Sequence, residues 1–477
     1  MMQPRMTAGL TRRGLTLGTA SAALAVGSVA LAACGGADAG SGSGGAAKPP
    51  VKLTYLSWRP IAMEQFAPAW KEYQTKNNAT IEVDPSGLGN QEKLITMFAS
   101  DSGPDLWDAN TSLLPKMYDN GFVLELTKYL SRDKIALDKD WAPLGIERWR
   151  QKTYAVPYWL EPFGIFYNKS LFRARGVDDP WEKSKGSWTL EQMVDAARKV
   201  NNPSQDVYGM QWGMGDYHGI GPLIWSHNVS HLQYDPQMKF DLQLPQFGNA
   251  LNTALDWMNR QKFNIVGPAA EMADSRTRLL AGKPGIDQPN GWNLFSSGKI
   301  GIHYRSVNDW RRMWNSIGTA FEWDMLPVPT MNGKPGAAWS AGHPVCAYGK
   351  TKSPDACWDF AKFLMEDEFQ GFLAENQFLV PAKKKHQARF FRAPEQYKYQ
   401  HPTVFADVYK KPYGIYWSHY RAGEDSALYN AEIGKIIKGE MSVQGTLKDL
   451  ETRLNALIDT GPGENPFKGI RWPIQPK

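Results

Sequence analysis

From residue 51 onward, the sequence alternates short runs typical of strands with longer segments of helical periodicity. Residues 53–58 are mostly apolar and aromatic and predict a first strand, and residues 80–83 predict a second. Between these runs, Phe66, Trp70 and Tyr73 recur at the spacing of one buried helix face. Strands that alternate with helices in this way predict an α/β fold with a largely parallel sheet.

The same alternation continues along the chain. Residues 92–100 predict a helix, and residues 103–107 enter the next strand. Thr189 with Gln192 fits a capping box at the start of a later helix. The run Ser-Pro-Asp at residues 353–355 predicts another helix start, with serine as the cap, proline in the first turn and aspartate at the positive end of the dipole.

The N-terminus has the features of an export signal that ends at a lipidated cysteine. Arg12 and Arg13 form a twin-arginine pattern, and residues 14–33 carry no charge. Residues 31–35 resemble a bacterial lipobox, which predicts cleavage before Cys34 and lipidation of its sulfur. The alternative is a plain membrane anchor of about 20 residues, but the stretch is mostly Ala, Gly, Ser and Thr and is therefore weakly apolar.

The next region is a predicted tether, and a two-lobed body follows it. Residues 35–50 are mostly small and polar, so they favour a flexible linker. The remaining body of about 425 residues is too long for one hydrophobic core, which favours two lobes. Its composition, 42% hydrophobic and 21% charged, is typical of a soluble globular protein.

The charge gives no support for nucleic-acid binding. Removal of Arg5, Arg12 and Arg13 with the signal lowers the net charge from +6 to +3, and the sequence has no dense run of Lys and Arg.

Two cysteines remain for the folded body. Cys346 lies in a predicted strand at residues 344–348, and Cys357 lies in the helix that follows residue 353. If that helix docks back on the strand, the two thiols could form a disulfide, which an exported protein permits. The alternative is two buried free thiols.

Several motifs in a fixed order resemble the extracellular solute-binding proteins of sugar ABC importers. The most recognisable is Lys-Thr-Tyr-Ala-Val-Pro-Tyr, which leads into Tyr-Asn-Lys-Ser-Leu-Phe, although Gln151 stands where the family usually has Gly. The resembling segments are Gly103–Trp107, Leu124–Leu130, Lys152–Tyr158, Ile165–Phe172, Gly298–Ile302, Ala341–Pro344 and Ser353–Phe360.

The resemblance implies a class II periplasmic-binding fold, in which two α/β lobes are joined by crossing hinge strands. It implies that the chain captures a sugar, delivers it to a membrane permease and acts as a monomer without a cofactor. Carried onto this chain, the predicted parts are a signal (1–33), the lipidated cysteine with its tether (34–50), lobe one (51–163 and 342–390), lobe two (164–337) and C-terminal helices that pack across both lobes (391–477).

Candidate ligand-binding residues follow from their positions at strand ends and at the two crossings, because ligands of such sheets bind beyond the carboxyl ends of the strands. They are Trp58, Arg59, Trp107, Asp108, Tyr158, Trp159, Glu161, Trp292, Tyr304, Trp339, Ser340 and Trp417. The preferred stacking platforms are Trp58, Trp159, Trp292 and Trp339, with Arg59, Asp108 and Glu161 as partners for sugar hydroxyls. For each tryptophan the alternative is a core role, and for each charged residue it is a solvated loop or a hinge salt bridge.

Two other functions remain open. An exported glycoside hydrolase would need two carboxylates facing one bond, and no motif fixes such a pair. The sequence contains no nucleophile-elbow, zincin or Walker signature, and its eight histidines show no metal-ligand spacing. The same fold could instead bind a polyamine, a peptide or another small polar solute.

Overall fold

The computed structural model describes most of the body of the chain. The described residues are 49–57, 60–84, 91–109, 114–137, 139–142, 148–213, 217–226, 232–233, 239–265, 294–410 and 422–461. The predicted signal, Cys34 and nearly all of the predicted tether lie outside them.

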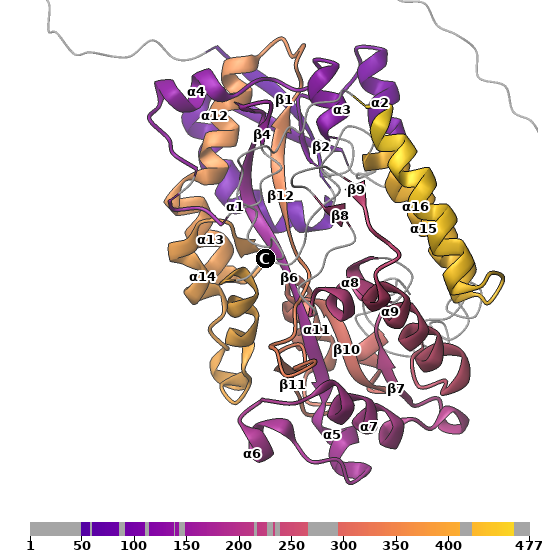
Figure 1. The fold of residues 1–477 in the computed structure, drawn as a ribbon. Coiled ribbons are helices and arrows are strands. Elements are labelled where there is room, and N and C mark those ends of the chain that lie inside the picture. Colours follow the sequence, from indigo (N-terminus) through magenta and orange to yellow (C-terminus); the bar gives the residue numbers. More distant parts are fainter. Residues whose placement is uncertain are drawn as a thin grey trace, which may run out of the picture. The chain divides into compact units, whose positions relative to one another are not determined.

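A nine-stranded mixed sheet links most of the described strands (Figure 1). Its order is β2-β1-β3-β12-β6-β10-β7, and β11 and β13 pair with β6 off this path. The strands are β1 (Val51–Leu56), β2 (Ala79–Asp84), β3 (Leu106–Asp108), β6 (Ala155–Asn168), β7 (Tyr208–Gln211), β10 (Ile300–Ser306), β11 (Trp323–Leu326), β12 (Ser340–Ala347) and β13 (Val380–Pro381). Two hairpins stand apart from it: β4 (Arg148–Trp149) with β5 (Lys152–Thr153), and β8 (Leu232–Gln233) with β9 (Lys239–Phe240).

The strand β6 is shared by two portions of this sheet. Its first half pairs with β12 and β13, and its second half pairs with β10 and β11. The pairs β1–β2, β1–β3 and β10–β7 are parallel, whereas every antiparallel pair among the described strands of this sheet includes β6 or β12. The expectation of a largely parallel sheet therefore holds only away from these two strands. The predicted lobe boundary at residues 163 and 164 falls inside β6.

Helices cover both faces of the sheet. They are α1 (Pro60–Asn77), α2 (Gln91–Ala99), α3 (Leu114–Asp119), α4 (Thr127–Arg132), α5 (Lys169–Ala174), α6 (Pro180–Ser184), α7 (Leu190–Val200), α8 (Tyr217–Trp225), α9 (Pro245–Leu255), α11 (Trp310–Ile317), α12 (Pro354–Met365), α13 (Asp367–Asn376), α14 (Lys384–Phe390), α15 (Ala422–Ile437) and α16 (Val443–Asp459). Shorter helical turns are η1 (Pro203–Gln205), η2 (Asp256–Arg260), η3 (Leu294–Ser297), η4 (Val307–Asp309), η5 (Glu395–Tyr397) and η6 (Pro402–Lys410). None of the helices within the described ranges combines the length and the apolar character needed to cross a bilayer.

The hydrophobic core consists of two clusters, one on each face of the sheet. Ile165 and Tyr167 belong to one cluster, and Phe166 between them belongs to the other, as the alternation of side chains along a strand requires. The first cluster includes side chains from α2, α7, α8, α9, α15 and α16. The second includes side chains from α1, α4, α11, α12, α13 and α14.

The first five elements confirm the predicted alternation. The order β1–α1–β2–α2–β3 is observed, and Phe66, Trp70 and Tyr73 of α1 are all buried in the second core cluster. The capping box of α7 is present, because Thr189 accepts from the backbone N–H of Gln192 while the Gln192 side chain accepts from the backbone N–H of Thr189.

The start of α12 is only partly as predicted. Pro354 and Asp355 occupy its first turn, but the Ser353 side chain makes no capping hydrogen bond. Instead, the backbone N–H of Ser353 donates to the Thr351 hydroxyl at 3.2 Å.

The β4–β5 turn forms without the glycine that is usual in this motif. Arg150 and Gln151 have φ values of 46° and 64°. A two-residue hairpin turn of type I′ requires positive φ at both central positions. The motif therefore keeps its tight turn here with two non-glycine residues in the left-handed region, which costs some conformational strain.

The disulfide between Cys346 and Cys357 was a wrong prediction, because both thiols are free and buried. The helix α12 does dock on the sheet, as expected. However, Cys346 belongs to the first core cluster, whereas its neighbours Val345 and Ala347 belong to the second cluster together with Cys357. The phase of β12 thus points Cys346 to the face opposite α12. The Cys357 sulfur lies 3.7 Å from the Thr351 hydroxyl.

Candidate functional site

Several predicted site residues meet where β6 and β12 pair. In the antiparallel register, Trp159 lies opposite His343, Glu161 opposite Ala341 and Pro162 opposite Ser340. The register shifts between His343 and Pro344, where proline cannot donate to the ladder. Segments about 180 residues apart in sequence are therefore joined at this point, which Figure 1 shows between β6 and β12.

Trp159, Glu161 and His343 form one contact group, which we call the crossing cluster. The rings of Trp159 and His343 stack with centroids 4.0 Å apart and an interplanar angle of 13°. His343 Nε2 lies 3.1 Å from Glu161 Oε2. Trp159 is 1% exposed and Glu161 is 8% exposed. The group thus holds an aromatic ring and a carboxylate in fixed positions at the crossing of the two strands.

Sequence reasoning missed His343. The residue lies inside the motif that marks the second crossing, between Gly342 and Pro344, but it belongs to no metal or catalytic pattern. Its place in that motif could have identified His343 as a candidate, because a residue on the second crossing strand lies beside residues of the first crossing strand.

Asp108 lies at the end of β3 in a buried hydrogen-bond network. Its carboxylate accepts from the hydroxyls of Tyr55, Ser57 and Tyr158, the last two at 2.6 Å each. Asp108 is fully buried. Burial and the adjacent Asp108 carboxylate raise the pKa of both tyrosines well above its usual value, so both keep the protons that they donate. An ionised carboxylate has about four acceptor positions, and three hydroxyls occupy most of them. The network joins β1, β3 and β6.

A second aromatic group lies just before β12. The backbone N–H of Trp339 donates to the Tyr304 hydroxyl at 2.9 Å, and the Trp339 ring meets Phe163 edge-on at 5.0 Å. Trp212 stacks on Tyr304 with centroids 4.4 Å apart. The structure therefore brings the predicted residues Trp339 and Tyr304 together, and it adds Phe163 and Trp212, which sequence reasoning missed.

The other predicted residues lie elsewhere. Trp107 is 1% exposed and packs against Phe98 in the first core cluster, with ring centroids 4.8 Å apart. Ser340 is buried at the start of β12. The residues Trp58, Arg59, Trp292 and Trp417 lie outside the described residues.

The crossing cluster does not have the composition of a metal site. Within the described ranges, no three His, Cys, Asp or Glu side chains are placed so that they could hold a metal ion. The cluster instead holds a buried aromatic ring and a carboxylate on either side of the His343 ring.

Known proteins resemble this chain in sequence and in fold. Residues 57–371 match the family of bacterial extracellular solute-binding proteins. The diacetylchitobiose-binding protein DasA of Streptomyces coelicolor is 22% identical over 331 residues, which are 67% of this chain and 70% of that protein.

Solved structures with the two-lobed fold of periplasmic binding proteins superpose well on this chain. The substrate-binding protein Lmo0181 of Listeria monocytogenes, in complex with cycloalternan, has a TM-score of 0.70 and 18% identity, with 86% of this chain and all of that chain covered. The GacH receptor of Streptomyces glaucescens, studied with acarbose, has a TM-score of 0.69 and 15% identity, with 87% of this chain and all of that chain covered. Because the family match spans well over half of its length, this chain belongs to the bacterial extracellular solute-binding proteins.

Proposed function

We propose that this chain is the substrate-binding component of an ABC importer and that it captures a sugar, in particular an oligosaccharide. The observation that carries the proposal is the crossing cluster, because a stacked tryptophan beside a fixed carboxylate is what a sugar needs. The support from relatives is that DasA binds diacetylchitobiose and that Lmo0181 was solved with cycloalternan.

The cluster contains the two kinds of group that a sugar binds, an aromatic ring and a hydrogen-bonding carboxylate. A sugar has apolar C–H faces, which stack on aromatic rings, and hydroxyls around its rim, which need fixed donors and acceptors. Trp159 and Trp339 are the proposed stacking platforms among the described residues, and Glu161 is the proposed acceptor for hydroxyl protons. His343 holds the Glu161 carboxylate in place. Asp108 takes a positioning role in this proposal, because its carboxylate already accepts three hydroxyls.

Trp58, Arg59, Trp292 and Trp417 remain predicted members of the same site. Trp58 and Trp292 are further stacking platforms in this proposal, and Arg59 is a donor to sugar hydroxyls. Tyr158, Tyr304 and Ser340 would support the site from β6, β10 and β12.

The proposed mechanism is a shift between two states of the protein. A sugar that contacts residues of both lobes binds better when the lobes are closed, so it favours the closed state by its difference in affinity for the two states. The closed protein then docks on the membrane permease, and ATP hydrolysis takes place in a partner subunit. In this proposal the chain is not an enzyme.

The proposal includes export and anchoring. The twin-arginine pattern directs export, and Cys34 receives the lipid that holds the protein on the outer side of the cell membrane, facing the extracellular or periplasmic space. Residues 35–50 then tether a monomeric folded body to that surface. Mass spectrometry of Cys34 peptides from the native membrane would test this step, because an unmodified cysteine there would overturn it.

A thermal-shift screen of the purified chain tests the cargo. A ligand that binds only the folded state raises the melting temperature, by an amount that grows as RT ln(1 + [L]/Kd). The screen includes mono- and oligosaccharides, polyamines and short peptides. We expect a sugar that stabilises the chain and is recovered intact. A polyamine or peptide hit would keep the family and overturn the cargo, and a cleaved sugar would indicate a hydrolase.

A further inference from the structure

A groove of about 210 Å³ lies between the C-terminal half of α1 and the junction of α12 with α13. Its lining includes Glu72 and Tyr73 from α1 and Phe363, Glu366 and Glu368 from α12 and the start of α13. None of these residues belongs to the crossing cluster. Its function is therefore separate from that of the proposed sugar site.

Carboxylates without ion-pair partners surround this groove. Glu72, Glu366 and Glu368 are exposed, and none of them forms an ion pair within the part of the chain that the structure describes. The groove lysine Lys362 lies 3.0 Å from Asp133 and is therefore already paired.

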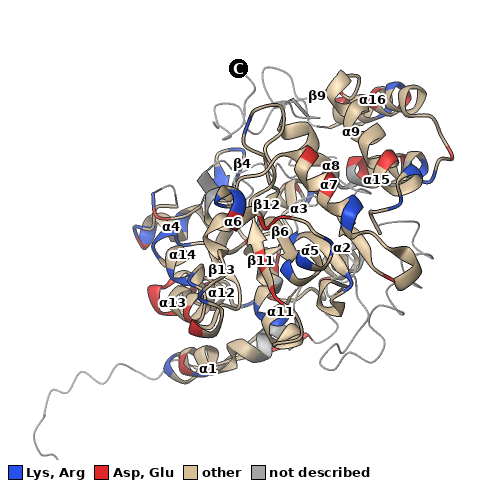
Figure 2. Ribbon diagram, turned by 90° about the horizontal axis from the view of Figure 1, so that it is seen from below, with Lys and Arg blue, Asp and Glu red and all other residues tan. Residues whose placement is uncertain are grey.

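The neighbouring Asp367 provides a contrast, because it pairs with Lys383, Lys385 and His386. Acidic residues are visible on α13 in Figure 2. Lys383 and Lys385 thus pair with Asp367, and in the adjacent groove the three glutamates outnumber Lys76, the lysine of the lining that forms no ion pair among the described residues.

The floor of the groove holds a hydroxyl without a hydrogen bond. Tyr73 is 6% exposed, and its ring packs between Phe360 at 5.2 Å and Phe363 at 4.9 Å. Its hydroxyl makes no hydrogen bond to any described residue, although it lines the groove. Burial, with Asp359 nearby, raises the pKa of Tyr73, so the hydroxyl is protonated. The hydroxyl lines the groove, so a polar group that enters the groove can hydrogen-bond to it.

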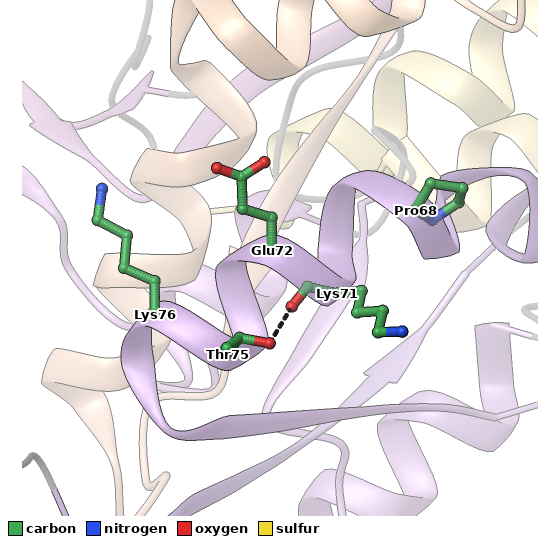
Figure 3. A pocket seen from close by; sticks show the side chains of 5 residues that line it. All are labelled: Pro68, Lys71, Glu72, Thr75 and Lys76. Carbon is green, nitrogen blue, oxygen red and sulfur yellow. Dashed lines mark hydrogen bonds between the residues drawn. The ribbon is translucent and has the colours of Figure 1, made fainter.

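A second hollow adjoins the groove along α1. It is lined by Pro68, Lys71, Glu72, Thr75 and Lys76, and it shares Glu72 and Lys76 with the groove. Figure 3 shows Glu72 and Lys76 pointing to the same side of α1, while Lys71 points away. Glu and Lys four residues apart on a helix commonly pair, but these two form no ion pair in the structure. The Glu72 carboxylate therefore remains available to an incoming group.

We propose that this groove binds the guanidinium group of an arginine that a loop of a protein partner presents. A guanidinium has five donors in one plane, which suits several carboxylates at once and a hydroxyl acceptor. Its flat face also stacks on aromatic rings such as those in the floor of the groove. A divalent metal ion is a poor alternative, because the described part of the chain has no group of three potential ligands placed to hold one.

The test is a calorimetric titration of the full chain with the peptide acetyl-Gly-Arg-Gly-amide. Its matched control is the peptide with citrulline, which has the shape of arginine without the charge. We expect the arginine peptide to bind at least about tenfold more tightly, in line with the strength of charged hydrogen bonds. The double variant Glu366→Gln/Glu368→Gln should lower this affinity about fivefold, as the loss of partly exposed ion pairs predicts. Tyr73→Phe should lower it by a similar factor.

Glu440→Gln is the control variant, because Glu440 is an exposed carboxylate outside the groove. It should leave the affinity unchanged, and all variants should keep the melting temperature of the parent chain. Equal affinity for the two peptides, or no effect of the double variant, would overturn the proposal. Tighter binding of spermidine than of the arginine peptide would also overturn it, and so would a dimer in sedimentation that the double variant abolishes.

Discussion

Two histidines pair with opposite halves of β6, the half-buried His343 and the buried His303, and their surroundings differ. His343 lies opposite Trp159, stacks on its ring, and has a nitrogen 3.1 Å from the Glu161 carboxylate. His303 lies opposite Phe166, and its ring is nearly parallel to that of Phe295 at 5.8 Å. No side chain within the described ranges hydrogen-bonds to the ring of His303. Burial, with some effect from Arg305, lowers its pKa to about 3.

The difference is between two positions that lie opposite the same strand, one on β12 and one on β10. In the second half of β6 the structure surrounds a histidine with apolar rings and keeps it neutral. In the first half it places a carboxylate beside the histidine, which an apolar core does not require. A buried carboxylate costs free energy unless it gains partners or serves a ligand. Under the proposed function that ligand is a sugar, and the first half of β6 then contributes to its site.

The largest expected effect concerns His303 and pH. Its folded pKa of about 3 lies below the ordinary value of about 6.5. As the pH falls below about 6.5, the unfolded chain binds a proton that the folded chain does not, so stability is lost progressively down to about pH 3. The free energy of unfolding should fall by about 4 kcal/mol over this pH range.

His303→Leu should remove this part of the pH dependence. Urea unfolding of both proteins at pH 7 and pH 4 measures it, because carboxylates contribute equally to the two curves. If the variant and the parent lose stability in parallel, His303 is not the buried neutral group described above.

The next effect concerns Asp108. Asp108→Asn removes the charge that binds the hydroxyls of Tyr55, Ser57 and Tyr158. We expect a loss of about 2 kcal/mol in the free energy of unfolding, measured in urea at pH 7. Tyr158→Phe, which removes one of the three donors, should cost less. A variant that keeps its stability but loses sugar binding would instead make Asp108 a ligand contact.

A smaller effect is expected at Glu161, and it tests the comparison directly. Glu161→Gln keeps the shape of the side chain and removes its charge, so the affinity for the sugar found in the screen should fall about tenfold. His303→Leu, on the other half of β6, should change that affinity less than twofold. Calorimetric titration measures both. A similar loss in both variants would show that the two halves do not differ in function.

The smallest effect is expected from reducing agent. Because Cys346 and Cys357 are free, dithiothreitol should leave the melting temperature unchanged to within about 1 °C, whereas breaking a disulfide costs about 2–4 kcal/mol. Alkylation of the unfolded chain without reductant should label both residues. If the mass shows that neither cysteine was alkylated, the two cysteines form a disulfide and the structure is wrong on this point.

The sequence predicted the order of elements because local patterns determine it. Aromatic spacing in α1 and the Thr189–Gln192 pair act over a few residues, and both are confirmed. The candidate site could not be predicted in the same way, because it depends on contacts between segments that are far apart in the sequence. Tyr55 is an ordinary strand residue in the sequence, and only the pairing of β1 with β3 brings it to Asp108.

The two errors in the fold also have a physical cause. The docking of α12 was predictable from its apolar face, but the side of β12 on which Cys346 lies depends on the phase of that strand. A shift of one residue would have moved the thiol to the face of α12. Likewise, the crossing strands β6 and β12 bring antiparallel pairs into a sheet that the βα alternation alone predicts as parallel.

The most direct test of the central claim is a crystal structure of the chain with the sugar that the screen identifies. The account predicts a sugar ring in van der Waals contact, about 4 Å, with Trp159 or Trp339. It also predicts a sugar hydroxyl within about 3 Å of Glu161. A sugar bound elsewhere, with the crossing cluster unchanged and without contact to it, would contradict the account.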